Sequence, residues 1–227
     1  MEIQDNVLKE YLKNVYFITG TACSGKTTVS RALAAKHGFA VYDADQAFDR
    51  HRELSNRKDQ PAMNKNFKDA DVFFFRPYKE YADWLEQNAR EQLAFILMDL
   101  IGLSQSRVVI CDLHLTPDEA EWITEPDRVV FLLRNPENII EDYCNRPDHS
   151  DFNQFINSAS DPVRAKNNCN QTLAYVNRER YENVKKSRYF WLERDQNSTV
   201  ERTVLLVEKY FGFDSSRGRG YGSLGNP

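Results

Sequence analysis

The stretch GTACSGKT, residues 20–27, constrains the fold of this chain more than any other feature. A glycine, four residues, and then Gly25, Lys26 and Thr27 is the spacing of a phosphate-binding loop. Its glycines permit a turn whose N–H groups, with the N-terminus of the next helix, point at phosphate oxygens. Lysine in such a loop reaches the β- and γ-phosphates, and threonine binds Mg²⁺. The stretch therefore predicts a catalytic Lys26, Thr27 at the metal, and nucleotide contacts from Gly20, Thr21, Ala22, Cys23, Ser24, Gly25, Lys26, Thr27 and Thr28.

The residues on both sides of the loop have the pattern that this motif requires. VYFIT (15–19) is short, apolar and β-branched, as expected of a buried parallel strand. TTVSRALAAKHG (27–38) places Val29 and Leu33 on one helical face and ends in glycine. Strand, loop and helix follow in the required order, so nucleotide binding is the favoured interpretation over a glycine turn that binds nothing.

Composition excludes several classes of protein. The hydrophobic fraction of 41% can build a core, and a net charge of −4 argues against a general nucleic-acid binder. No apolar run reaches membrane-spanning length, and the charged N-terminus lacks the apolar region of a signal peptide. The four cysteines have no C-x-x-C or metal-ligand spacing. We therefore expect a cytoplasmic protein with reduced thiols and no membrane partner.

Strands and helices alternate along most of the chain. Strands are predicted at 15–19, 39–45, 107–113, 128–133 and 187–193, and helices at about 82–104, from 116, from 135 to about 145, at 163–186 and from 198. TPDE (116–119) and STVE (198–201) read as capping boxes. This order predicts an α/β fold of three layers, α/β/α, in which helices cover a five-stranded parallel sheet. The domain is expected to span residues 1–213, followed by a flexible tail at 214–227 that is rich in glycine.

Carboxylates follow two of the predicted strands. In open α/β sheets ligands bind at the carboxyl ends of strands, so Asp43, Asp45 and Asp112 are candidate site residues. Asp112 is expected to orient the water shell of Mg²⁺. Residues i and i+2 of an extended chain share a face, so Asp43 and Asp45 can point into one cleft and serve as catalytic carboxylates. Ordinary turn or cap chemistry is the alternative for all three.

With these motifs the chain resembles the P-loop small-molecule and nucleoside-monophosphate kinases, and shikimate-kinase-like members are nearest in layout. The resemblance is carried by GTACSGKTTVSRALA, VYDAD, VVICD and FLLRNPENIIEDYCNR. It implies a catalytic arginine near the adenine, Arg146, and a lid at 147–165. After the third strand the chain has Asp-Leu-His-Leu, where shikimate kinases have a glycine triplet. This difference argues against shikimate as the phosphoryl acceptor.

The long segment 46–106 is expected to form a helical insert that binds the phosphoryl acceptor, because connections of this length are usually functional. Basic side chains in and beyond it suit a small anionic or ring-bearing molecule. His114 can face the cleft, although a local hydrogen-bonding role is the commoner one for such a histidine. The predicted acceptor-binding residues are Asp45, Arg57, Arg76 and Arg164.

These features together predict an ATP- and Mg²⁺-dependent kinase that acts on a small acceptor such as a nucleotide, nucleoside or metabolite. A regulatory P-loop NTPase without an acceptor is one alternative, although no N-K-x-D base-reading motif is present. A kinase of nucleic-acid ends is another, which the acidic balance disfavours. The acceptor, the preferred nucleotide base and the oligomeric state stay open.

Overall fold

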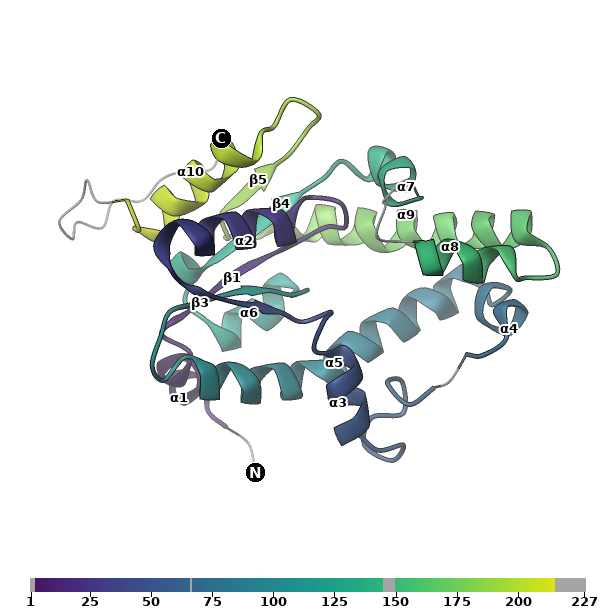
Figure 1. Ribbon diagram of the computed structural model, residues 1–227, viewed down its shortest axis with the longest axis horizontal. Helices are drawn as coiled ribbons and strands as arrows, with labels where there is room; N and C mark the ends of the chain where they lie inside the picture. Colours follow the sequence, from purple (N-terminus) through teal and green to yellow (C-terminus); the bar gives the residue numbers. More distant parts are fainter. Residues whose placement is uncertain (1–2, 66, 145–149, 215–227) are drawn as a thin grey trace.

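The computed structural model describes residues 3–65, 67–144 and 150–214 (Figure 1). Its centre is a parallel sheet in the order β2-β3-β1-β4-β5. The strands are β1 (Val15–Gly20), β2 (Ala40–Asp43), β3 (Val109–Asp112), β4 (Val129–Leu133) and β5 (Trp191–Glu193). The predicted three-layer α/β/α fold with five parallel strands is confirmed.

Helices precede, connect and follow these strands. They are α1 (Asp5–Tyr11), α2 (Lys26–His37), α3 (Phe48–Leu54), α4 (Ala70–Phe74), α5 (Tyr78–Leu103), α6 (Pro117–Ile123), η1 (Pro126–Arg128), α7 (Pro136–Cys144), α8 (Ser150–Asn157), α9 (Pro162–Lys186) and α10 (Val200–Phe211). None of the helices in the described ranges is long and apolar enough to cross a membrane.

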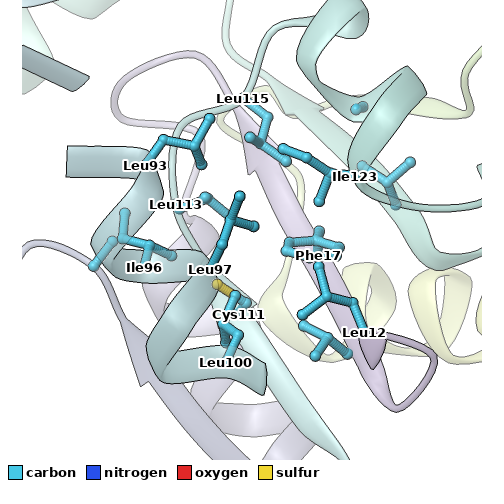
Figure 2. Packing of buried hydrophobic residues seen from close by; sticks show 14 of the residues in the cluster. Leu12, Phe17, Leu93, Ile96, Leu97, Leu100, Cys111, Leu113, Leu115 and Ile123 are labelled. Atoms are coloured by element: carbon cyan, nitrogen blue, oxygen red, sulfur yellow. The ribbon is translucent and has the colours of Figure 1, made fainter. Parts of the chain in front are cut away.

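Each face of the sheet carries its own hydrophobic core, because alternate strand residues point to opposite sides. On β1, Phe17 packs with side chains of α1, α5 and α6, while Ile18 packs with those of α2 and α10. Figure 2 shows the first core, to which α5 contributes Leu93 and Leu97 and β1 contributes Phe17. Both faces of β1 are thus buried, which fixes the strand that leads into the phosphate loop.

A third, smaller core lies away from the sheet, where α4 and the first turns of α5 meet α8 and the start of α9 (Figure 1). It contains Phe73, Phe74, Tyr81, Ile156 and Cys169. The aromatic run of the predicted insert is therefore core. Because α8 and α9 pack on the same cluster, the insert and the described part of the predicted lid form one packed unit.

Some local predictions were wrong in detail. The strand predicted at 187–193 begins only at Trp191, and the helix predicted from 82 already begins at Tyr78. The capping box at 116–119 forms, but the one at 198–201 does not. Ser198 instead hydrogen-bonds Asp195 at 2.7 Å within a turn, which leaves Thr199 to cap α10 by accepting from the Arg202 N–H. The predicted tail, apart from Asp214, lies outside the described residues.

Candidate active site

The phosphate loop has a backbone that only glycine permits at two positions. Gly20 has φ of 127°, and a Cβ there would lie 1.9 Å from the carbonyl oxygen of Leu132 on β4. Gly25 has φ of 80°, and its Cβ would lie 1.9 Å from Nη1 of Arg194. The first clash is with backbone and the second with a side-chain end, so the two glycines are required for different reasons.

Side chains from distant elements hold the loop in place. Thr21 is buried and its Oγ1 accepts from the Arg134 N–H at 2.7 Å, which ties the loop to the end of β4. From α9, Oδ1 of the buried Asn177 accepts from the Ala22 N–H at 2.8 Å. On the other side, Nη1 of Arg194 donates to the Ser24 carbonyl at 2.7 Å. Sequence reasoning missed Asn177 and Arg194, because neither belongs to a motif and both come from elements far along the chain.

Lys26, Thr27 and Asp112 lie together at the carboxyl ends of β1 and β3. Burial lowers the pKa of Lys26, an effect opposed by the nearby carboxylates of Asp112 and Asp45. Burial raises the pKa of Asp112, while Lys26 and a hydrogen bond with Thr27 act in the opposite direction. The Lys26 ammonium itself donates to the Thr21 carbonyl at 2.9 Å. A hydroxyl and a carboxylate in contact, next to the phosphate loop, suit a hydrated Mg²⁺ brought by a nucleotide.

Asp43 and Asp45 occupy different surroundings, although the sequence placed them on one face. Asp43 ends β2, forms an ion pair with Arg31 at 3.2 Å and accepts from the backbone N–H groups of Asp45 and Gln46. Extended geometry stops at Asp43, so the i, i+2 relation no longer applies beyond it. Asp45 then turns toward a cavity between β2 and α5. The structure therefore brings Asp45, rather than the pair, to the cleft.

This cavity has a volume of about 370 Å³, within the range of small-molecule sites. It lies between the ends of β2 and β3 and the middle of α5. The residues that line it are Ala44, Asp45, Phe48, Leu85, Asn88, Ala89, Gln92, Leu93, Ile96, Leu113 and His114. Apolar side chains thus form most of the wall, with one carboxylate, two amides and one imidazole.

A polar network beneath the cavity joins β2, α3 and α5. His51 on α3 is fully buried, and its Nε2 lies 2.8 Å from Oδ2 of Asp99. The same carboxylate accepts from the Tyr42 hydroxyl at 2.6 Å and from Arg50. Gln92 spans the gap between this network and the cavity, since its amide donates to the Ala44 carbonyl at 2.8 Å. The network fixes the turn that presents Asp45.

The arginines predicted to bind the acceptor do not line this cavity. Arg57 is exposed in a turn. Arg76 is buried among the rings of the third core, with its guanidinium 4.2 Å from the Phe67 centroid. Arg164 is exposed at the start of α9 and stacks on Phe75 at 4.3 Å. Arg146, predicted to be catalytic, lies outside the described residues.

Two further polar residues lie beside the phosphate loop. Burial lowers the pKa of Arg180 on α9 to about 10, although three glutamates oppose this shift. Arg180 and His114 share a small pocket with Gly20. Burial, Arg180 and Lys26 lower the pKa of His114 well below its usual value, opposed by a hydrogen bond between its ring and the Gly20 backbone. Its Nε2 is covered and has no hydrogen-bond partner. The sequence offered Arg180 only as part of a charged helix, a pattern more typical of a solvated surface.

The chain belongs to a family whose model, described as AAA domain, matches residues 17–157. That range runs from β1 through the phosphate loop, the cavity and α7 into α8. The resemblance to the P-loop small-molecule and nucleoside-monophosphate kinase superfamily is thereby confirmed. No match was found among curated proteins.

Solved structures share the fold. TT1252 from Thermus thermophilus is 21% identical with a TM-score of 0.51, and the match covers 86% of this chain and 96% of that one. A shikimate kinase from Bacteroides thetaiotaomicron is 16% identical with a TM-score of 0.45, covering 87% and 98%. A dephospho-CoA kinase from Campylobacter jejuni has the same identity and TM-score, with coverage of 87% and 97%. At 21% identity the likeness to TT1252 concerns the fold alone.

Proposed function

We propose that this protein is an ATP-dependent kinase that transfers the γ-phosphoryl group to a small molecule bound between β2, β3 and α5. One observation carries the proposal: a cavity of small-molecule size, with a carboxylate in its wall, lies next to the phosphate loop. The adjacency follows from one shared residue, because His114 lines this cavity and also the pocket that contains Gly20. An NTPase without an acceptor has no need of such a cavity.

Phosphoryl transfer depends mainly on positioning and on neutralising charge. The loop residues 20–28 would hold the phosphates, and Lys26 would contact the β- and γ-phosphates. Thr27 and, through water, Asp112 would hold Mg²⁺, which supplies charge neutralisation between the phosphates when bound. The contact between Thr27 and Asp112 and the nearness of Lys26 to Asp112 support these roles.

Asp45 is the group best placed to orient the acceptor hydroxyl and take its proton. It lines the cavity and lies close enough to Lys26 to raise the pKa of that ammonium. Asp43 would act on Asp45 as a positioning residue, since its carboxylate accepts the Asp45 N–H at 3.2 Å. In this arrangement only one of the two carboxylates contacts the acceptor.

Closure over the bound nucleotide would involve residues 147–165, with Arg146 near the adenine or the phosphates. Arg180 adds a cation from the described part of the chain. It lies near Lys26 and beside Gly20, where it can contact phosphate oxygens. Residues 46–106 would then provide the acceptor-binding insert, through Asp45 at its border and the face of α5 that lines the cavity.

Asp45→Asn tests the assignment, with the exposed Asp49→Asn on α3 as the matched control. Loss of a general base costs about 10²–10⁴-fold in rate, so acceptor-dependent transfer by Asp45→Asn should fall by that factor. Its ATP affinity, measured by calorimetry, should stay within a few-fold of the wild-type value, and Asp49→Asn should be normal in both. Wild-type transfer by Asp45→Asn would refute the role of Asp45.

A further inference from the structure

The charge of the cavity wall restricts which acceptors can bind, if the chain is the kinase proposed above. Among the described residues that line the cavity, Asp45 is the only acidic side chain, and there is no lysine or arginine. The described cations that act on Asp45 and His114 are Lys26 and Arg180, which lie on the phosphate-loop side and contact the nucleotide phosphates in the function proposed above. A carboxylate or phosphate on the acceptor would therefore meet the Asp45 carboxylate without a cation in the wall to compensate it. Anion-binding sites have the opposite character, with arginine or lysine as the usual partners.

Two arginines of the insert are engaged elsewhere, and Arg90 on α5 lines a different pocket. Arg50 is paired with Asp99 in the network beneath the cavity. Arg76 donates from Nε to the Phe73 carbonyl at 2.9 Å and lies within about 5 Å of four aromatic centroids, which belong to Phe67, Phe73, Tyr81 and Trp84. Its guanidinium is thus stabilised by cation–π contacts inside the third core rather than presented to the cavity.

The rest of the wall suits a molecule with an apolar body and polar hydrogens. Phe48, Leu85, Leu93, Ile96 and Leu113 supply apolar surface. The polar groups include two acceptors of hydrogen bonds. One is the Asp45 carboxylate. The other is Nε2 of His114, which is covered and has no partner, because burial favours the neutral ring and that ring already bonds the Gly20 backbone. A covered polar atom without a partner costs free energy, and a donor from a bound molecule that reached Nε2 would remove that cost.

We propose that the phosphoryl acceptor is a hydroxylated compound without an anionic group, such as a nucleoside, a sugar alcohol or an amino alcohol, and not a nucleotide or a sugar acid. Its reacting hydroxyl donates to Asp45 and a second hydroxyl or amino group donates to His114. In the transfer step the acceptor O–H bond breaks and its proton passes to Asp45. The acceptor oxygen bonds to the γ-phosphorus, and the bond from that phosphorus to the β,γ-bridging oxygen breaks, so that ADP leaves with the electron pair.

The test uses pairs of acceptors that share a skeleton and differ by one anionic group. Suitable pairs are nucleosides with their 5′-monophosphates, and sugar alcohols with the matching sugar acids. ADP formation by the full chain should be stimulated by the uncharged member of one pair, with kcat/KM at least about 10-fold above that of its anionic partner. Stimulation by anionic members alone would overturn the inference while leaving the kinase activity standing. ATP turnover that no member changes would contradict the kinase activity itself.

A charge introduced into the wall should alter this preference. Asn88 lies on the face of α5 that lines the cavity, so Asn88→Arg places a cation there, and Asn88→Gln is the uncharged control. We expect Asn88→Arg to narrow the preference for the uncharged acceptor by about 10-fold or more, and Asn88→Gln to preserve it. An unchanged preference in an Asn88→Arg protein that binds ATP normally would show that the wall charge does not select the acceptor.

Two replacements distinguish the hydrogen-bond role of His114 in acceptor binding from a role in folding. His114→Phe removes the hydrogen-bond acceptor, whereas His114→Gln keeps an oxygen that can accept. We expect kcat/KM for the acceptor to fall about 10–100-fold in His114→Phe, with a smaller change in ATP affinity, and to recover partly in His114→Gln. An acceptor analogue that lacks the second hydroxyl should be used equally well by wild type and His114→Phe. If His114→Phe lost as much kcat/KM with that analogue as with the full acceptor, His114 would only support the fold and would not bind the second hydroxyl.

Discussion

At the scale of single residues, Gly25 is where the phosphate loop meets the side chain of Arg194. Gly25→Ala adds a Cβ at φ of 80° and within 1.9 Å of the Arg194 Nη1, so Arg194 must release the Ser24 carbonyl. We expect ATP affinity to fall by at least about 10-fold, because the backbone N–H groups that hold phosphate are displaced. Isothermal titration with ATP measures this loss.

Gly38→Ala is the matched control for this substitution. Gly38 also has positive φ, 69°, but a Cβ there meets no atom within 4 Å. The variant should lose roughly 1–2 kcal/mol of unfolding free energy from backbone strain and keep wild-type ATP affinity. If Gly25→Ala bound ATP as well as Gly38→Ala does, the tight approach of Arg194 to the loop would have no role in binding.

At the scale of elements, α9 supports the phosphate loop through one hydrogen bond. Asn177→Ala removes the partner of the Ala22 N–H and leaves that group without its 2.8 Å bond. We expect an ATP affinity several-fold weaker and a loss of about 1 kcal/mol of stability. Arg178→Ala, on the exposed side of the same helix, should change neither quantity. Equal ATP affinity in the two variants would mean that α9 does not order the loop.

The polar network between β2, α3 and α5 makes the stability of the fold depend on pH. Burial of Asp99 opposes its ionisation, but hydrogen bonds from Arg50, Tyr42 and His51 outweigh burial and lower its pKa from 3.8 to about 2. Since the folded-state pKa lies below that of the unfolded chain, this stabilisation is present above about pH 4 and is lost as pH falls toward 2. It amounts to about 2 kcal/mol.

Urea unfolding of Asp99→Asn should therefore show a deficit of about 2 kcal/mol at pH 6 that shrinks as the pH is lowered toward 3. The deficit shrinks because the Asp99 carboxylate of the unfolded chain binds a proton as the pH falls below 3.8, and it disappears only when folded Asp99, with a pKa of about 2, is protonated as well. A deficit that stays constant over this range would show that the ionised carboxylate does not account for the stability.

Sequence reasoning reached the elements and the loop but not the whole site. The phosphate loop and the strand-end aspartates were predictable, because their function requires residue types at fixed spacing or at a strand end. The positions of Arg76 and Asp43 could not be predicted, because they depend on tertiary contacts. Arg76 packs on the rings of the third core, and Asp43 pairs with Arg31 at the start of a turn. Asn177, Arg180 and Arg194 gave no local signal, since they approach the loop from more than 150 residues along the chain.

At the scale of the whole molecule, two units meet at the site. The sheet supplies the phosphate loop and the carboxylates, while α5 extends from the sheet core to the third core and lines the cavity on its way (Figure 1). The helix α9 contacts both the phosphate loop and the third core. A movement of α4, α8 and the first turns of α5 can therefore be transmitted to the phosphate loop through α9. This arrangement suits an enzyme that closes on two substrates.

The central claim is that ATP and an acceptor react in this protein. The most direct measurement is ADP formation by the full chain with Mg²⁺ and ATP, alone and with uncharged hydroxylated acceptors, with mass spectrometry of the acceptor and Lys26→Ala as the blank. We predict slow turnover alone, strong stimulation by one acceptor class, and a phosphorylated product that Lys26→Ala does not form. Turnover that no acceptor changes, with no phosphorylated product, would contradict the account and favour a regulatory NTPase.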